Sequence, residues 1–334
     1  AWAKKGILFK NFYANGFQTR HGEIATYCSV MPNYGAAVLK HFAKNQFHCL
    51  PEVLRENGYS TTWFHAGDAS FDGQATFFQE NGFEKIIDKF DFPSGTEELG
   101  WGYSDQVLFQ KVLSTLPTLK EPFFASVLTI TNHHPFEVPT EYELGLGNQD
   151  LHNYYNSVHY MDSKLGEFLS LAEKEPWFEN TLIIITADTS SFQPPQSKPK
   201  DFGEFVSIRS RIPLLILGGP IEQNTEINEF ASQIDLAPTI MDLLGLTWTS
   251  PWVGKSLIAR QDLLIAYTNR PGSYWAVMSK EGSVYSENDN KFHVDENMDP
   301  QLGKRLKSLG SSWLKVTSWL LQEDLYWPNS GKNN

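Results

Sequence analysis

Short apolar runs alternate with amphipathic stretches along most of this 334-residue chain. Two of the runs, Leu182–Ile185 and Pro213–Leu217, contain only apolar residues, as strands do when both of their faces are covered. Alternation of this kind is typical of a sheet built from repeating strand–helix units. The predicted strands are Thr61–His65, Phe123–Thr131, Thr181–Ala187, Ile212–Leu217, Leu263–Tyr267 and Tyr274–Met278.

The clearest helical pattern covers residues 150–173, where apolar side chains recur at steps of four and three residues. These side chains are Tyr154, Val158, Met161, Leu165 and Phe168. A second helix is expected after Asp235, which suits an N-cap, with Pro238 in its first turn and Gly245 at its C-terminal end. The stretch Leu302–Leu321 predicts a last helix that packs on the outside.

We therefore predict an α/β protein with a mainly parallel central sheet flanked by helices on both faces, and with Thr181–Ala187 as a central strand. Since 41% of the residues are hydrophobic, the chain can bury a sizeable core. The segment Gln193–Lys200 (QPPQSKPK) is expected to be a loop within one domain, because strand-like runs flank it. The predicted organisation is one domain over residues 1–262 and a small α+β extension, residues 263–334, packed on it.

The net charge of −12 argues against a protein that binds nucleic acid or an anionic membrane unaided, because a uniformly acidic surface would repel both. The apolar runs are far too short to span a bilayer. No signal peptide is visible, and Ala1 is an unusual start for a natural protein. We therefore expect this chain to be a soluble piece of a longer protein.

Two cysteines, Cys28 and Cys49, are too few for a disulfide framework or a cysteine metal site. Two alternatives stay open for them. They are either two small buried side chains or a single disulfide in an oxidising compartment.

Three segments carry candidate chemistry. The first, Asn11–Gly35 (NFYANGFQTRHGEIATYCSVMPNYG), suggests a turn that opens a helix, where anions are favoured, and the residues alone favour Thr19 as a cap. The second, Leu128–Phe136 (LTITNHHPF), presents two imidazoles at the end of a strand, ordinarily one exposed and one hydrogen-bonded inside. The third, Thr181–Ser190 (TLIIITADTS), ends an apolar strand in Asp188, which is a common way to present a carboxylate to a metal.

These segments resemble those of the lipoteichoic-acid-synthase-like phosphoglycerol transferases, a branch of the sulfatase and alkaline-phosphatase superfamily. Smaller matches extend the resemblance from roughly residue 7 to residue 268, and this coverage makes it specific. They lie at Leu50–Gly73, Asn81–Asp88, Gly100–Phe109, Glu175–Asp188 and Ser232–Gly245.

The resemblance implies that Thr19 is a nucleophile that forms a phosphothreonine intermediate and also binds a metal. It implies Asp188 as a second ligand of one divalent ion, with Mn²⁺ expected and Zn²⁺ or Mg²⁺ as alternatives. His133 would hold the substrate phosphate, and His134 is a weaker candidate. Trp101 would lie beside the phosphoglycerol head. We further expect Thr19, His133 and Asp188 to share one cleft.

Other positions carry structural expectations. Pro32 and Gly35 would close the turn that follows the first segment. For Trp101, packing against neighbours is an equal alternative to substrate binding, and Asp105 is expected to cap a helix or pair locally.

The chain departs from the family pattern at two metal ligands. Thr189 stands where the family has a histidine, and its hydroxyl is a poor substitute for an imidazole towards Mn²⁺ or Zn²⁺. The family's further acidic ligand, which precedes the first segment, has no counterpart in Ala1–Gly6. Thr19 and Asp188 therefore remain as ligands.

The resemblance implies a metal-dependent phosphoglycerol- or phosphoethanolamine-type transferase or phosphodiesterase. Its donor would be a phospholipid head group, its acceptor a glycan or glycerol phosphate, and its membrane-anchored parent would face outside the cell. Two ligands are missing, so either the chain lacks the family's first strand and is altered at Thr189, or it is a degenerate family member that binds a glycerophosphate-like or glycan ligand. Sulfatase activity is disfavoured, since Cys28–Pro32 (CSVMP) lacks the [C/S]-x-P-x-R spacing.

Overall fold

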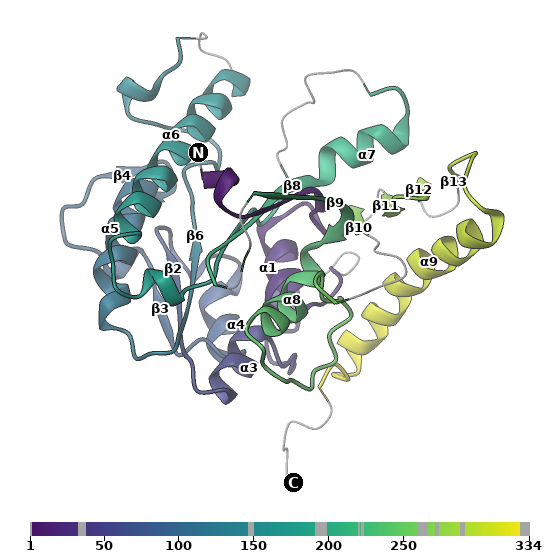
Figure 1. The fold of residues 1–334 in the computed structure, drawn as a ribbon, viewed down its shortest axis with the longest axis horizontal. Helices are drawn as coiled ribbons and strands as arrows, with labels where there is room; N and C mark the ends of the chain where they lie inside the picture. Colours follow the sequence, from purple (N-terminus) through teal and green to yellow (C-terminus); the bar gives the residue numbers. More distant parts are fainter. Residues whose placement is uncertain are drawn as a thin grey trace. The chain divides into compact units, whose positions relative to one another are not determined.

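The computed structural model describes residues 2–32, 38–145, 150–190, 199–219, 221, 224–259, 266–270, 274–287 and 291–327. The chain divides into two compact units (Figure 1). The first unit comprises Ala1–Val53 and Leu182–Asn334, and the second comprises Leu54–Thr181. The predicted division into residues 1–262 and 263–334 stays a prediction. Gly35, most of the expected loop at Gln193–Lys200 and the start of the expected strand at Leu263 lie outside the described residues.

A four-stranded sheet with the order β7-β8-β1-β9 organises the first unit. Its strands are β1 (Ile7–Tyr13), β7 (Ile183–Thr186), β8 (Arg211–Leu217) and β9 (Thr225–Ser232). The expected parallel pairing holds for β1 with β9, whereas β8 runs antiparallel to both β1 and β7. The sequence pattern did not predict β1, because Lys10 and Asn11 interrupt its apolar residues.

The position of β7 differs from the expected one. Within the sheet of its unit β7 is an edge strand that pairs with β8, so the expectation of a central strand at Thr181–Ala187 is wrong for this sheet. A run of apolar residues indicates that both faces of a strand are covered, but it does not predict which strands pair with its two edges. The strand itself is confirmed, with bounds shorter than expected.

Both faces of β1 are covered. Phe12 is fully buried in a cluster with side chains of β8 and with Leu236. The next residue, Tyr13, points to the other face and belongs to a cluster with Val206. Because successive side chains of a strand point to opposite faces, these two residues hold β1 between two apolar layers.

A second sheet in the first unit is antiparallel and has the order β10-β11-β12-β13. Its strands are β10 (Ala266–Arg270), β11 (Tyr274–Ser279), β12 (Gly282–Glu287) and β13 (Lys291–Val294). The C-terminal helix α9 (Pro300–Gln322) packs on it through Leu306, in a cluster with Trp275 and Val284. The predicted last helix is thus confirmed.

The other helices of the first unit are short. They are α1 (Thr19–Cys28), α2 (Val38–His41), α7 (Phe202–Ser210) and α8 (Leu236–Leu243). Two 3₁₀ turns lie at Trp2–Lys5 and Gln233–Asp235. Helix α3 (Leu50–Glu56) spans the boundary between the two units. As expected, Asp235 is the N-cap residue of α8, and Gly245 follows the helix with a φ of 66°.

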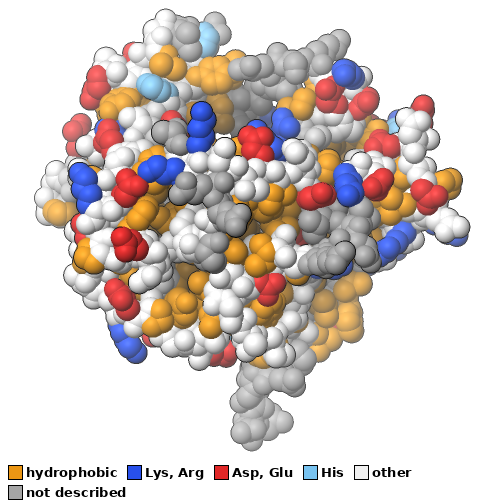
Figure 2. Space-filling view, in the orientation of Figure 1, with side chains coloured by type: hydrophobic (Ala, Val, Ile, Leu, Met, Phe, Trp, Pro, Cys, Tyr) orange, Lys and Arg blue, Asp and Glu red, His pale blue; other side chains and the backbone are white. Residues whose placement is uncertain are grey.

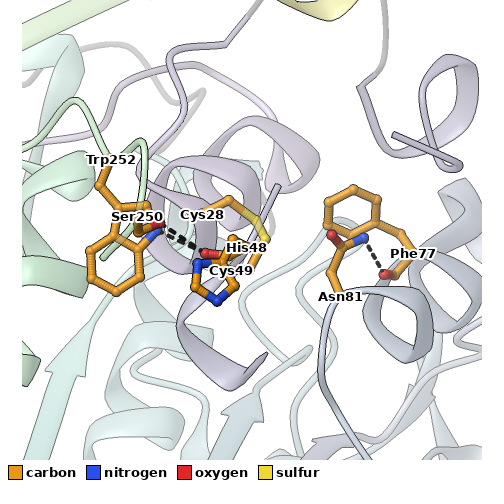
Figure 3. Close-up of a disulfide and its surroundings, with 7 residues drawn as sticks. All are labelled: Cys28, His48, Cys49, Phe77, Asn81, Ser250 and Trp252. Carbon is orange, nitrogen blue, oxygen red and sulfur yellow. Dashed lines mark hydrogen bonds between the residues drawn. A yellow bond between two sulfur atoms is a disulfide. The ribbon is translucent and has the colours of Figure 1, made fainter. Parts of the chain in front are cut away.

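Cys28 and Cys49 form a disulfide, which settles the alternative left open by the sequence. The bond links the end of α1 to the residue before α3, and both cysteines are buried. Figure 3 shows that Ser250 and Trp252 donate hydrogen bonds to the carbonyl oxygen of His48, at 3.1 and 3.0 Å. The backbone beside the disulfide is therefore fastened to a segment about two hundred residues further along the chain.

The second unit contains a parallel sheet with the order β3-β2-β6. Its strands are β2 (Ser60–His65), β3 (Lys85–Ile87) and β6 (Phe123–Leu128), and a hairpin is formed by β4 (Glu98–Leu99) and β5 (Gly102–Tyr103). Its helices are α4 (Gln74–Glu80), α5 (Asp105–Thr115) and α6 (Asp150–Ala172), with 3₁₀ turns at Phe71–Gly73, Lys89–Asp91, Leu116–Thr118, Thr140–Tyr142 and Phe178–Asn180. The strand expected at Phe123–Thr131 ends earlier, at Leu128. Within the described residues, none of the helices has the length and apolar character that crossing a membrane requires.

The helix predicted at residues 150–173 is confirmed as α6, but its most buried residues differ from the apolar stripe. Ser157, Tyr160 and Lys164 are buried, whereas the residues of the stripe are only partly buried. Lys164 is accommodated because its ammonium group lies 5.0 Å from the ring centre of Tyr142 and 2.9 Å from a carboxylate oxygen of Glu167. The aliphatic part of the Lys164 side chain is buried where an apolar side chain would be expected, and its ammonium group is paired with Glu167.

The buried carboxylate of Asp235 joins two segments of the backbone by hydrogen bonds. It accepts hydrogen bonds from the backbone N–H of Ser232 and of Lys255, both at 2.9 Å. Burial raises the pKa of Asp235 to about 7, although these two donors and the charge of Lys255 oppose the shift. The folded protein therefore holds a proton on this group that the unfolded chain releases near pH 4.

We predict that Asp235 makes the protein less stable as the pH rises from about 4 to about 7. Between these values the folded state binds more protons than the unfolded state, so the free energy of unfolding falls by at most about 1.4 kcal/mol per pH unit. An Asp235→Asn variant should lose this dependence. Urea unfolding of both proteins at several pH values measures it, and parallel stability profiles would contradict the prediction.

Candidate active site

Thr19 is the first residue of α1, and it is partly exposed. The N-cap is Gln18, whose side chain makes no capping hydrogen bond, so the expectation that Thr19 caps the helix is wrong. The backbone N–H groups of His21 and Gly22 both donate to the carbonyl of Gln18, at 2.8 and 3.2 Å. The Thr19 hydroxyl therefore belongs to the first turn of a helix, where the dipole favours negative charge.

Asp188, two residues after the end of β7, lies against this first turn. A Cβ atom placed on Gly22 would overlap the carbonyl oxygen of Asp188. Gly22 is three residues after Thr19, so the backbone of Asp188 lies against α1 one turn from the candidate nucleophile. Only a glycine at position 22 allows the Asp188 backbone to come this close to α1. The contact brings Asp188 near Thr19, although the two residues are far apart in sequence.

A buried pair of side-chain amides fixes this arrangement. Gln233 donates from Nε2 to the carbonyls of Ala187 and Asp188, at 3.0 and 2.6 Å. Its Oε1 atom accepts from the backbone N–H of Asn15 at 2.9 Å. The side chain of Asn15 in turn accepts from the N–H of Ile234 at 3.0 Å. The end of β1, the 3₁₀ turn at Gln233 and the end of β7 are thereby joined.

The residues around Thr19 do not fit the divalent metal that the resemblance implies. Thr19 and Asp188 would supply oxygen ligands, and Thr189 supplies a neutral hydroxyl where an imidazole is expected. The buried Oγ1 of Thr189 has no hydrogen-bond partner among the described residues. Over the same residues, no group of three or more His, Cys, Asp or Glu side chains could hold a metal ion. Zn²⁺ sites ordinarily use at least three protein ligands.

In the second unit, polar groups gather where the parallel strands β2 and β6 end. His65, the last residue of β2, lies 3.0 Å through Nδ1 from the carbonyl oxygen of Leu128. Burial lowers the pKa of His65, with a further lowering from the nearby His133, while the Leu128 carbonyl and two aspartates oppose it. His65 is thus held neutral near His133.

Asp105 positions the loop that leads to His133. Its Oδ1 atom accepts from the N–H groups of Ile130 and Thr131, at 3.0 and 3.1 Å. The expectation that Asp105 caps a helix or pairs locally is therefore wrong, because its partners come 25 and 26 residues later. Burial raises the pKa of Asp105, and these hydrogen bonds oppose the shift.

His133 and His134 are both exposed, so the expectation of one exposed and one internal histidine is wrong. The ring of His133 lies 4.1 Å from that of Trp101, centre to centre, and its Nδ1 lies 2.8 Å from the carbonyl oxygen of His134. Trp101 is 51% exposed at the tip of the β4–β5 hairpin, and its ring also contacts that of Phe71 at 5.8 Å, so packing and substrate binding both stay open for it. His134 instead contacts the ring of Phe136, at 5.7 Å.

The candidate residues thus form two groups. Thr19 and Asp188 belong to the first unit, and His133, His134 and Trp101 belong to the second. The predicted cleft shared by Thr19, His133 and Asp188 stays a prediction.

The sequence interpretation assigned no role to Asn15, Gln233 or His65. All three lie inside or beside segments that carried the resemblance, which was the only available signal. Their contacts join residues that are distant in sequence, and no local pattern reveals such contacts.

Comparison with known proteins places these observations in context. The family model described as Sulfatase matches residues 1–246. Lipoteichoic acid synthase 2 of Bacillus subtilis is 23% identical over 90% of this chain and 50% of its own length. Phosphoglycerol transferase I of Xanthomonas euvesicatoria is 27% identical over 64% of this chain and 31% of its own length. The chain therefore spans half or less of these two relatives.

The fold is also found among solved structures. An alkaline-phosphatase-superfamily protein from Vibrio parahaemolyticus has a TM-score of 0.82 at 25% identity, covering 97% of this chain and 80% of its own. The α/β fold expected from the sequence is confirmed as alkaline-phosphatase-like.

We predict that Gly22→Ala lowers the free energy of unfolding by about 1–3 kcal/mol, because the added methyl group displaces the Asp188 backbone. Gly166→Ala is the matched control, since Gly166 also lies in a helix but has open space around its Cβ position. It should raise stability by up to about 1 kcal/mol. Urea unfolding compares the three proteins, and equal effects of the two substitutions would contradict the assigned contact.

Proposed function

The chain belongs to the Sulfatase family, whose model matches residues 1–246, and on that premise we propose that it handles phosphoglycerol- or phosphoethanolamine-type phosphodiesters. The donor is a phospholipid head group, and the acceptor is a glycan, glycerol phosphate or water. The observation that carries the proposal is the position of Thr19, in the first turn of α1 with the Asp188 backbone held against that helix. The names of the relatives support the substrate class.

In the proposed reaction the Thr19 hydroxyl oxygen attacks the phosphorus atom of the donor. A bond forms between this oxygen and phosphorus, and the bond from phosphorus to the diacylglycerol oxygen breaks. Thr19 loses its proton, and the departing diacylglycerol gains one. An acceptor hydroxyl then attacks the phosphothreonine and frees Thr19. The first-turn amides of α1 favour the phosphate charge in both steps.

His133 and Trp101 are proposed to bind the head group. The exposed imidazole of His133 can donate a hydrogen bond to a phosphate oxygen, and the exposed face of Trp101 can pack on the glycerol carbons. His134 faces Phe136 and stays the weaker candidate.

A specific observation favours the second candidate, a degenerate member that binds the ligand with little turnover. A threonine hydroxyl needs strong activation at neutral pH, and the ligand set around Thr19 and Asp188 does not fit the metal that would supply it. We therefore propose slow turnover for this chain.

The proposed location is the extracytoplasmic face of the cell membrane, with the parent protein anchored there. The Cys28–Cys49 disulfide supports it, because such bonds persist in oxidising compartments.

We predict that the chain releases diacylglycerol from a fluorescent phosphatidylglycerol analogue slowly, and that added Mn²⁺ changes the rate little. Thr189→His adds an imidazole beside Asp188 and should make the rate depend on Mn²⁺, with a rise of tenfold or more. Thr19→Ala should abolish the release in both backgrounds. A fast rate in the unmodified chain would contradict the account of the ligands, and release that survives Thr19→Ala would contradict the nucleophile.

We also predict that His133→Ala weakens the binding of glycerol 1-phosphate about tenfold, which corresponds to one charge-assisted hydrogen bond of about 1.4 kcal/mol. The matched control is His134→Ala, the exposed neighbouring imidazole, which should change the affinity less than twofold. Calorimetric titration measures both. Equal losses in the two variants would remove the specific role of His133.

A further inference from the structure

Among the described residues, the C-terminal helix α9 packs on the rest of its unit along one face. Gly310 lets the helix approach the sheet, since a Cβ there would overlap the ring of Trp275. Leu306 and Leu321 are almost fully buried on the same face. At 1.5 Å per residue the helix is about 34 Å long, so its opposite face forms an extended convex ridge.

Apolar side chains are exposed near the C-terminal end of this ridge. Trp319 is 54% exposed and Val316 is 48% exposed. They are three residues apart and therefore neighbours on the helix surface. Trp319 points away from the buried face, because it lies about 180° around the helix from Gly310. Ser308 and Ser312 continue the exposed face toward the N-terminal end with small polar side chains.

The same helix has a charge opposite to that of the chain. It carries Lys304, Arg305, Lys307 and Lys315 and contains no Asp or Glu, in a protein whose net charge is −12. Lys304, Arg305 and Lys315 are exposed on or beside the ridge, whereas Lys307 lies over the ring of Phe292. In the view of Figure 2, Lys and Arg side chains (blue) lie along α9, and hydrophobic side chains (orange) lie at its lower end.

Acidic residues flank the two ends of the helix, and three of them accept hydrogen bonds from backbone N–H groups. Asp299 caps the helix by accepting from Gln301 and Leu302. Asp295 accepts from the N–H of Ser283, and Asp324 accepts from the N–H of Gln46. Glu296 and Glu323 remain exposed at the two ends. Glu323 follows Trp319 by four residues, so it lies on the same side of the helix and opposes binding to an anionic surface there.

We propose that the exposed face of α9, defined by Lys304, Arg305, Lys315, Val316 and Trp319, lies flat on an anionic phospholipid surface. An exposed tryptophan beside an apolar neighbour suits the interface between head groups and acyl chains, and the basic side chains reach the lipid phosphates. A convex ridge offers no pocket for a small ligand. Three exposed basic residues are also too few for tight nucleic-acid binding.

The inference does not rest on the phosphotransfer chemistry, and it revises the expectation drawn from net charge. The charge of −12 argued against binding to an anionic membrane on the assumption that the surface is uniformly acidic. Alpha-helix α9 breaks that assumption locally. At physiological ionic strength charges interact over about 8 Å, so the membrane senses the facing helix more than the distant acidic groups.

The test is flotation of the 334-residue chain with phosphatidylcholine vesicles that contain or lack phosphatidylglycerol. Binding is expected only with phosphatidylglycerol, and high salt should weaken it. The triple variant Lys304→Gln/Arg305→Gln/Lys315→Gln should bind at least tenfold more weakly, since each basic residue near such a surface contributes about fivefold. Its matched control removes three exposed charges elsewhere, at Lys85, Lys120 and Lys174, and should bind as the unmodified chain does.

The apolar contribution has its own pair of variants. Val316→Ser/Trp319→Ser should also bind at least tenfold more weakly, whereas Leu171→Ser/Ile258→Ser, at residues of similar exposure (50% and 46%), should not. Thermal unfolding checks that all variants fold. No binding to phosphatidylglycerol vesicles, equal binding to neutral vesicles, or equal losses in the control variants would each overturn the proposal.

Discussion

The first unit depends on the buried amides of Asn15 and Gln233, which are both fully inaccessible to solvent. Burying an amide without partners costs several kcal/mol, so the pair is tolerated only where its polar atoms are satisfied. Asn15 also donates from Nδ2 to the carbonyl of Tyr267 at 2.9 Å. The two side chains thereby hold β1, β7, β10 and the 3₁₀ turn before α8 at one point. These hydrogen bonds hold the Asp188 backbone against Gly22, and they thereby fix the position of Asp188 relative to the first turn of α1, which contains Thr19.

Local patterns predicted the elements of this fold, and contacts between distant residues decided the rest. The strands at Thr61–His65 and Ile212–Leu217 and the long helix α6 were readable, because apolar periodicity records which faces are covered. The edge position of β7 in the sheet of its unit could not be predicted from the sequence, since strand order depends on which strands pair. The strand β1 was hidden because Lys10 and Asn11 break its apolar run. For the candidate site, the types of residue could be named, but Asn15 and Gln233 are separated by 218 positions and have no shared local signature.

Net charge illustrates the same difference between composition and arrangement. A sum over the chain predicts long-range repulsion or attraction, but a surface within a Debye length responds to the groups that face it. In α9 the basic residues and Trp319 occupy a face that the rest of the first unit leaves exposed, while Asp295, Asp299 and Asp324 are turned to backbone N–H groups. The net charge of the chain therefore does not describe the charge of this face.

Contacts within the protein hold the segments around Thr19 and Asp188. The end of β7 is held by Gln233, α1 is joined to Cys49 through the disulfide, and Asp235 fastens the segment around Lys255. None of these three interactions uses the side chain of Thr189. A threonine at position 189, where the resemblance implies a histidine, therefore leaves these contacts in place.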